Sequence, residues 1–301
     1  MEKIAFLLKT YKDDHIYYKR LVETFFKYNV DHIKLYVVVP QKDIHLFRME
    51  DPLIEVIGEE NLPVNYFQKK CNGFSPGYLN QQIVKLAFWE LGLCENYFCI
   101  DADCYFIKNF YVSDFIYQDN IPYSIFWDDR ELMEKPYYYE GYGKARERYN
   151  RIICNELQAD KRLMKSCHGC AIFSRHVLES FKNEFLSKKG WDYRDIIAKA
   201  PLEFTWYNYW LLKSHTIEIY EKVPLVKYYH TTKQLLTDIC HNVSIWNLRK
   251  YYIGVIVQSN FGKSSGIYDY EEACNNKKWL MITLAKEIKE ASKKMLGSKK
   301  Q

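Results

Sequence analysis

Apolar and polar residues alternate along the first third of the chain as they do where strands and helices follow one another. Short apolar runs rich in β-branched and aromatic residues predict buried strands at 4–10, 33–39, 53–57 and 97–100. Apolar residues at helical spacing predict helices at 14–28 and 77–91. This order predicts an α/β fold with a largely parallel sheet, which binds ligands at the carboxyl ends of its strands.

The second half of the chain is less regular, and its pattern predicts a mixed structure. Candidate strands lie at 123–127, 169–174, 216–220, 225–229 and 253–258. Candidate helices lie at 175–186, 202–213 and 271–296, and a tyrosine-rich loop followed by a helix lies at 131–155. Since no linker rich in Pro, Gly or Ser interrupts the sequence, we expect one domain over 1–270 and a basic amphipathic helix and tail over 271–301.

Composition and charge narrow the class of protein. With 48% hydrophobic residues the chain can bury a large core, and a net charge of +5 is too small to indicate a nucleic-acid partner. Aromatic residues reach 17%, which suits stacking on sugars and bases but equally fits a tyrosine-favouring genome. The nine cysteines lack disulfide spacing, and the first apolar run is short for a signal peptide, so we expect a cytoplasmic protein with reduced thiols.

The strand predicted at 97–100 leads directly into Asp101-Ala102-Asp103. In extended geometry the side chains of Asp101 and Asp103 point the same way, so they can share one partner. Two converging carboxylates repel each other unless a cation lies between them, and hard oxygen ligands suit Mg²⁺ or Mn²⁺, which also hold a substrate diphosphate. The alternative is a turn in which the aspartates cap the following element.

Three segments together resemble a known family: the strand ending in Asp101-Ala102-Asp103, GYLNQQIVKL at 77–86, and LEFTWYNY at 202–209. Over residues 3–260 the sequence resembles GT-A-fold, nucleotide-sugar-dependent glycosyltransferases, and among them a bacterial group from capsule and lipopolysaccharide loci. The resemblance implies a GT-A-like single domain with a Rossmann-like, nucleotide-binding N-terminal half and a mixed acceptor-binding half. It also implies a nucleoside diphosphate sugar as donor and a glycan or lipid-linked glycan as acceptor.

The resemblance implies a metal site. Asp101 and Asp103 would hold Mn²⁺ or Mg²⁺, which neutralises charge on the leaving nucleoside diphosphate. His230, after the strand predicted at 225–229, would be a third ligand, and His241 is the second candidate. A surface loop histidine is the alternative interpretation of His230.

On the donor side, Lys9 and Thr10 at the end of the first strand would border the nucleotide, together with Asp101. Gln82 and Lys85 would lie on a helix that faces the Asp-x-Asp strand, where Lys85 meets a phosphate or a sugar hydroxyl. For Lys85 the alternative is a solvated helix face.

A general base is needed if the transfer inverts the anomeric carbon, because the acceptor hydroxyl must lose its proton during the attack. Glu203 is the first candidate, since its apolar and aromatic neighbours would make its carboxylate a stronger base. Its alternative role is that of a carboxylate at a helix start, stabilised by the helix dipole. Asp128 and Asp129, after the strand predicted at 123–127, compete with it.

Two other classes of protein fit parts of the pattern. A nucleotidyltransferase shares the sheet and the metal carboxylates but carries a Gly-rich loop after its first strand, and residues 10–14 contain no Gly. A non-catalytic glycan-binding protein would use an aromatic groove of the same fold. Cys167-His168-Gly169-Cys170 invites a zinc interpretation, but the chain offers no second Cys-x-x-Cys.

The basic helix predicted at 271–296 admits two interpretations. It carries apolar residues, among them Trp279, Leu284 and Ile288, interspersed with lysines. Either the apolar residues pack on the catalytic domain, or the helix is a peripheral anchor on the anionic inner face of the membrane, close to a lipid-linked acceptor.

Overall fold

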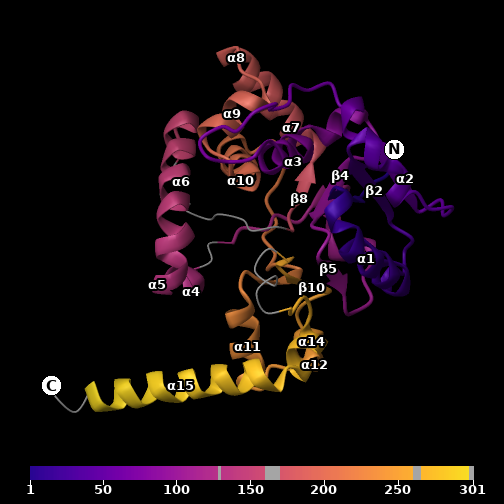
Figure 1. The fold of residues 1–301 in the computed structure, drawn as a ribbon. Coiled ribbons are helices and arrows are strands. Elements are labelled where there is room, and N and C mark those ends of the chain that lie inside the picture. Colours follow the sequence, from indigo (N-terminus) through magenta and orange to yellow (C-terminus); the bar gives the residue numbers. More distant parts are fainter. Residues whose placement is uncertain (128–129, 160–169, 260–265, 298–301) are drawn as a thin grey trace. The chain divides into compact units, whose positions relative to one another are not determined.

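The computed structural model describes residues 1–127, 130–159, 170–259 and 266–297 (Figure 1). Contacts divide the chain into two compact units. The first unit contains residues 1–15, 29–102 and 110–224. The second unit contains residues 16–28, 103–109 and the region from 225 onward.

The first unit is built on a five-stranded sheet with the order β3-β2-β1-β4-β8. Its strands are β1 (Ala5–Lys9), β2 (Lys34–Val39), β3 (Ile54–Gly58), β4 (Asn96–Ile100) and β8 (Ile172–Ser174). The first four are parallel to one another, and β8 runs antiparallel to β4 at the edge. The prediction of an α/β fold with a largely parallel sheet is therefore confirmed.

Burial explains why these strands were predictable. Every residue of β4 is buried, as is every residue of β1 except the last. Parallel strands that are covered on both faces require continuous apolar runs, which the sequence supplies.

Helices surround the sheet of the first unit, and the longest are α3 (Pro76–Ala87), α6 (Lys144–Leu157) and α10 (Glu203–Ser214). The shorter ones are α2 (Ile44–Phe47), α4 (Arg130–Met133), α5 (Pro136–Tyr138), α7 (Arg175–Ser180), α8 (Ser187–Lys189) and α9 (Tyr193–Lys199). α3 begins where the Ser75 hydroxyl accepts a hydrogen bond from the Tyr78 N–H, with Pro76 in the first turn. Residues 203–211 of α10 are all buried, so this helix belongs to the core.

The second unit has a three-stranded sheet with the order β5-β10-β9. Its strands are β5 (Cys104–Phe106), β9 (Val226–Tyr229) and β10 (Gly254–Val257), and β10 is antiparallel to β5 and parallel to β9. Its helices are α1 (His15–Tyr28), whose first residue is assigned to the first unit, α11 (Thr232–Cys240), α12 (Ile245–Leu248), α14 (Tyr270–Asn275) and α15 (Lys277–Gly297). Its core is a separate cluster that includes Tyr105, Tyr229 and Leu235.

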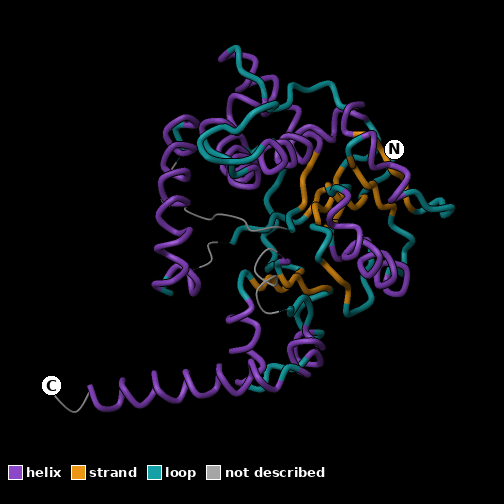
Figure 2. Tube along the Cα trace, viewed as in Figure 1, coloured by secondary structure: helices purple, strands orange, loops and turns teal. Residues whose placement is uncertain are grey.

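Predicted elements that the structure corrects lie mainly in the second half. The strands expected at 123–127 and 216–220 do not form; Ser124 makes one isolated bridge, with Glu221 just after the second segment. A short hairpin of β6 (Ile116–Gln118) and β7 (Ile121–Pro122) precedes them. The helix expected at 271–296 is two helices, α14 and α15, which are separated at Asn276. In Figure 2, where helices are purple and strands orange, the region of α14 and α15 is helical.

None of the helices in the described part of the chain combines the length and the apolar composition that crossing a membrane would require.

Candidate active site

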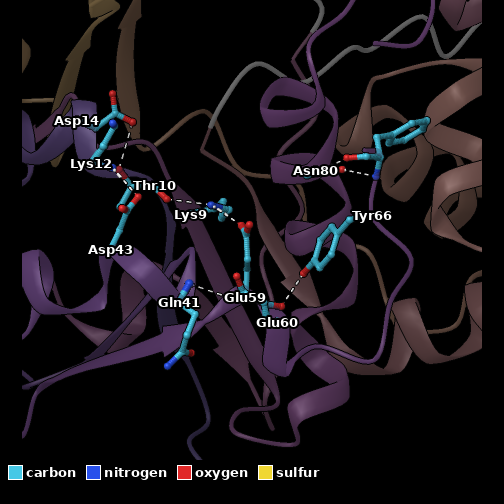
Figure 3. A network of polar contacts seen from close by, with 11 residues as sticks. Lys9, Thr10, Lys12, Asp14, Gln41, Asp43, Glu59, Glu60, Tyr66 and Asn80 are labelled. Atoms are coloured by element: carbon cyan, nitrogen blue, oxygen red, sulfur yellow. Dashed lines mark hydrogen bonds and ion pairs between the residues drawn. The ribbon is translucent and has the colours of Figure 1, made fainter. Parts of the chain in front are cut away.

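Polar side chains gather where β1, β2 and β3 end in the first unit (Figure 3). The Lys9 Nζ lies 2.9 Å from a carboxylate oxygen of Glu59 and donates to the Thr10 carbonyl at 2.8 Å. The Thr10 hydroxyl donates to Asp14 at 3.1 Å, and the backbone N–H of Lys12 donates to Asp43 at 3.2 Å. Lys9 and Thr10 thus lie at the carboxyl edge of the sheet, where parallel α/β sheets bind ligands.

Lys85 lies near the C-terminal end of α3 and joins two carboxylates. Its Nζ is 3.2 Å from Asp101 Oδ1, just after β4, and 3.2 Å from Glu203 Oε1, the first residue of α10. The Lys85 side chain is only 5% exposed, which excludes the solvated helix face. The Phe204 ring centroid lies 4.9 Å from the same Nζ.

The charges of this cluster determine the ionisation of Lys85. Burial by itself would lower the pKa of the Lys85 ammonium, but the negative charges of Asp101 and Glu203 outweigh burial and raise that pKa above its usual value. Lys85 is therefore charged at neutral pH, and its two carboxylate partners are held by one buried cation. Removing Lys85 would leave two carboxylates without their shared cation, whereas removing either carboxylate leaves one ion pair.

Asp14 adds a further carboxylate to this edge of the first unit. Burial is the largest cause that raises the pKa of the Asp14 carboxyl, and the negative charge of Asp101 raises it further, against the hydrogen bond from Thr10. The carboxylates of Asp14 and Asp101 are thus close enough to repel each other. Asp14 was not predicted from the sequence, although the pair Asp13-Asp14 shortly after a buried strand was a signal.

Gln82 lies on α3 one turn before Lys85 and is buried. Its side-chain amide donates to the Tyr78 carbonyl at 3.3 Å. Its Oε1 is buried and has no hydrogen-bond partner among the described residues. An unpaired buried oxygen costs free energy, so Gln82 is a candidate acceptor for a hydrogen bond from a ligand hydroxyl.

In the second unit, Asp103 and His230 lie at the same edge of the three-stranded sheet. Asp103 precedes β5 and accepts a hydrogen bond from the Ser259 N–H at 2.8 Å, and His230 follows β9. The strand register brings the start of β5, the end of β10 and the end of β9 to that edge. His230 is buried, which excludes an exposed loop histidine, and its ring lies against Tyr228.

The Asp101-Ala102-Asp103 segment differs from its expected geometry. β4 ends at Ile100, and Ala102 and Asp103 form a turn before β5. Because the backbone is not extended there, the prediction that Asp101 and Asp103 point the same way from an extended strand is wrong. The division between the two units falls after Ala102, so each aspartate has its partners in a different unit.

Some predicted residues lie outside the described part of the chain: Asp128, Asp129, and three of the four residues of the Cys167-His168-Gly169-Cys170 segment. Among the described residues no group of three or more His, Cys, Asp or Glu side chains is arranged to hold a metal ion. The second histidine candidate, His241, follows α11 and is exposed.

Comparison with known proteins places the chain in a family. Residues 4–263 match the model of DUF6492, a family of unknown function, and the chain belongs to that family. A comparison with curated proteins gives no match. Among solved structures, the chain is similar to the apo structure of the WbbM bifunctional glycosyltransferase, with 11% identity and a TM-score of 0.44. That similarity covers 94% of this chain, which spans about half (51%) of the WbbM chain.

Proposed function

We propose that this protein is a metal-dependent glycosyltransferase of GT-A-like fold. It transfers a sugar from a nucleoside diphosphate sugar to a hydroxyl of a surface glycan of the capsule or lipopolysaccharide type. The observation that supports this most is the cluster at the carboxyl end of β4, in which Lys85 and Glu203 are buried and Asp101 is part-exposed. Such a charged cluster is costly to bury, and it lies where parallel α/β sheets bind their ligands.

The metal in this proposal is Mn²⁺ or Mg²⁺, and Asp101 and Asp103 are its ligands. Mg²⁺ in enzymes is commonly bound by one or two carboxylates, with substrate phosphates and water completing its coordination. The residues present fit that mode, because the carboxylates of Asp14 and Asp101 repel each other at this edge, and a bound cation would relieve that repulsion. When bound, the metal would supply charge neutralisation for the departing diphosphate. His230 as a third ligand remains part of the proposal.

The donor would lie along the carboxyl ends of β1 and β4. Lys9 and Thr10 border the nucleotide, and Gln82 accepts a hydrogen bond from a donor hydroxyl. Because Lys85 already faces two carboxylates, we infer that it holds a sugar hydroxyl and orients Asp101 rather than compensating phosphate charge.

In the reaction, the acceptor oxygen forms a bond to the anomeric carbon while the bond from that carbon to the diphosphate oxygen breaks. For an inverting transfer, the proton of the acceptor hydroxyl goes to Glu203, our candidate base. Glu203 is the first residue of α10 and also contacts Lys85. Its position at the helix start is therefore compatible with the proposed role of base. Asp128 stays the competing candidate.

The test is hydrolysis of nucleoside diphosphate sugars, since glycosyltransferases commonly transfer some sugar to water. The purified chain is incubated with UDP-, GDP- and CDP-sugars and Mn²⁺, and release of the nucleoside diphosphate is measured. We expect turnover with one nucleotide class, loss of turnover in EDTA, and a loss of at least a hundredfold in Asp101→Asn, on the scale of removing one catalytic electrostatic group.

Asp195→Asn is the matched control and should keep full turnover, because the exposed Asp195 carboxylate only accepts a hydrogen bond from the Asp192 N–H in the capping box of α9. Nucleotide binding without turnover would favour a glycan-binding protein of this fold. Pyrophosphate release from a nucleoside triphosphate and a sugar phosphate would favour a nucleotidyltransferase. Full turnover in EDTA would contradict the metal assignment.

A further inference from the structure

The helix α15 presents two faces with different exposure. On the inner face Thr283 is buried, and the Leu280 carbonyl lies 3.8 Å from the Cys240 thiol at the end of α11. Trp279 and Leu280 pack against the core of the second unit. The first turns of α15 therefore belong to that core, as the packed-helix interpretation expected.

The outer face of α15 is apolar and exposed. Met281, Leu284 and Ile288 are 68%, 48% and 59% exposed. Their spacing of three and four residues places them in one stripe along the helix. Single exposed apolar residues are ordinary, but a contiguous stripe on one helix face indicates a surface that meets a partner.

Positive charge accompanies this stripe. Lys277 lies one turn before Met281 on the same face, and the exposed lysines of the described side chains of α15 are Lys277, Lys278, Lys286 and Lys289. The one acidic residue among those side chains, Glu287, is half-buried. After burial, its negative charge is the further cause that raises the pKa of the Cys240 thiol at the end of α11. The acid is thus turned toward the core, and the solvent side of the helix carries lysines.

We propose that this outer face of α15 docks on an anionic lipid bilayer, with the helix lying along the membrane surface. Apolar residues in a row, bordered by lysines, are the features of helices that insert their apolar face among lipid headgroups. Pairing with a second copy would bring the same lysines together and bury only a narrow stripe, so charge favours the lipid surface. The same unit also exposes Trp246 and Tyr251, by 71% and 72%, and amphipathic aromatic rings are enriched at membrane interfaces.

The experiment is co-sedimentation of the full chain with vesicles of phosphatidylcholine alone and of phosphatidylcholine mixed with phosphatidylglycerol. We expect binding to the anionic vesicles at low salt, weaker binding at high salt, and none to the neutral ones. Lys277→Gln/Lys278→Gln/Lys289→Gln should lower the partition coefficient about a hundredfold, since each lysine near such a surface contributes about fivefold. Leu284→Ser/Ile288→Ser should also lower it, because both changed side chains are exposed and their loss leaves the core intact.

The matched control removes the same charge elsewhere. Lys69→Gln/Lys70→Gln/Lys188→Gln changes three exposed lysines of the first unit and should leave vesicle binding as in the parent chain. Equal binding to both vesicle types, or equal losses in the α15 and control variants, would overturn the proposal. So would a concentration-dependent dimer that Leu284→Ser/Ile288→Ser abolishes, because a second copy would then cover the face. None of these results depends on the proposed transferase activity.

Discussion

Asp101 and Asp103 are separated by one residue in the chain, yet the structure gives them different environments. Asp101 faces the buried ammonium of Lys85, which also faces Glu203. The environment of Asp101 is therefore set by charged side chains. Asp103 accepts a hydrogen bond from the backbone of Ser259 after β10. The first contact depends on charge, and the second depends only on an acceptor oxygen. Substitutions that change one property and keep the other can therefore separate a structural role from a catalytic one.

The largest effect is expected at Lys85. In Lys85→Met the buried Glu203 and the part-exposed Asp101 lose their shared cation, and we expect a loss of about 3–5 kcal/mol in the free energy of unfolding, together with loss of activity. Urea denaturation measures the stability. The control is Lys34→Met, which breaks a more exposed pair with Glu55 and should cost under about 1 kcal/mol. Equal losses in the two variants would show that the buried cluster is not the stabilising feature inferred here.

Glu203→Gln should have the next largest effect, and on activity rather than stability. If Glu203 is the base, transfer falls by about 10²–10⁴-fold while nucleotide affinity is unchanged, because its role lies on the acceptor side. Transfer kinetics and nucleotide titration by calorimetry measure the two quantities. Glu90→Gln is the control, since Glu90 is also a buried carboxylate paired with a lysine, Lys182, and should keep transfer. A parallel loss of nucleotide affinity would assign Glu203 to the donor side or to the fold.

The smallest effect is expected at Asp103. Asp103→Ala leaves the Ser259 N–H without its acceptor and should lower the free energy of unfolding by about 1 kcal/mol. Asp103→Asn keeps an acceptor oxygen and should retain most of that stability. If Asp103 also binds the metal, both variants lose activity. Since Asp103→Asn keeps the hydrogen bond, its loss of activity would be due to the lost charge. Activity retained in Asp103→Asn would leave it a purely structural residue.

The sequence predicted the parallel sheet because β1, β2 and β4 are buried on both faces and must be continuously apolar. The strand prediction was wrong at 123–127 and 216–220, where apolar composition suggested strands but the structure has one isolated bridge, from Ser124 to Glu221 just after the second segment. Strand formation depends on a partner along the whole segment, which composition does not reveal.

For the site, the family resemblance implied that Lys85 lies on a helix facing the strand that ends before Asp101, and Lys85 does contact Asp101 in the structure. The contact of Lys85 with Glu203 could not be predicted. It joins residues far apart in the chain and depends on how α3 packs against α10, which no local pattern encodes. The roles of these residues remain predictions.

The way the chain passes between the two units has a consequence for folding during synthesis. β5 belongs to the second unit, but its partner β10 follows about 150 residues later, and α1 is made earlier still. At the usual ribosomal rate of about 5–20 residues per second, β5 waits on the order of ten seconds for its partner. The first unit can complete its core in that time, whereas α1 and β5 keep apolar surface exposed. The nascent chain is thus most open to chaperone binding, and to aggregation, at these two early segments.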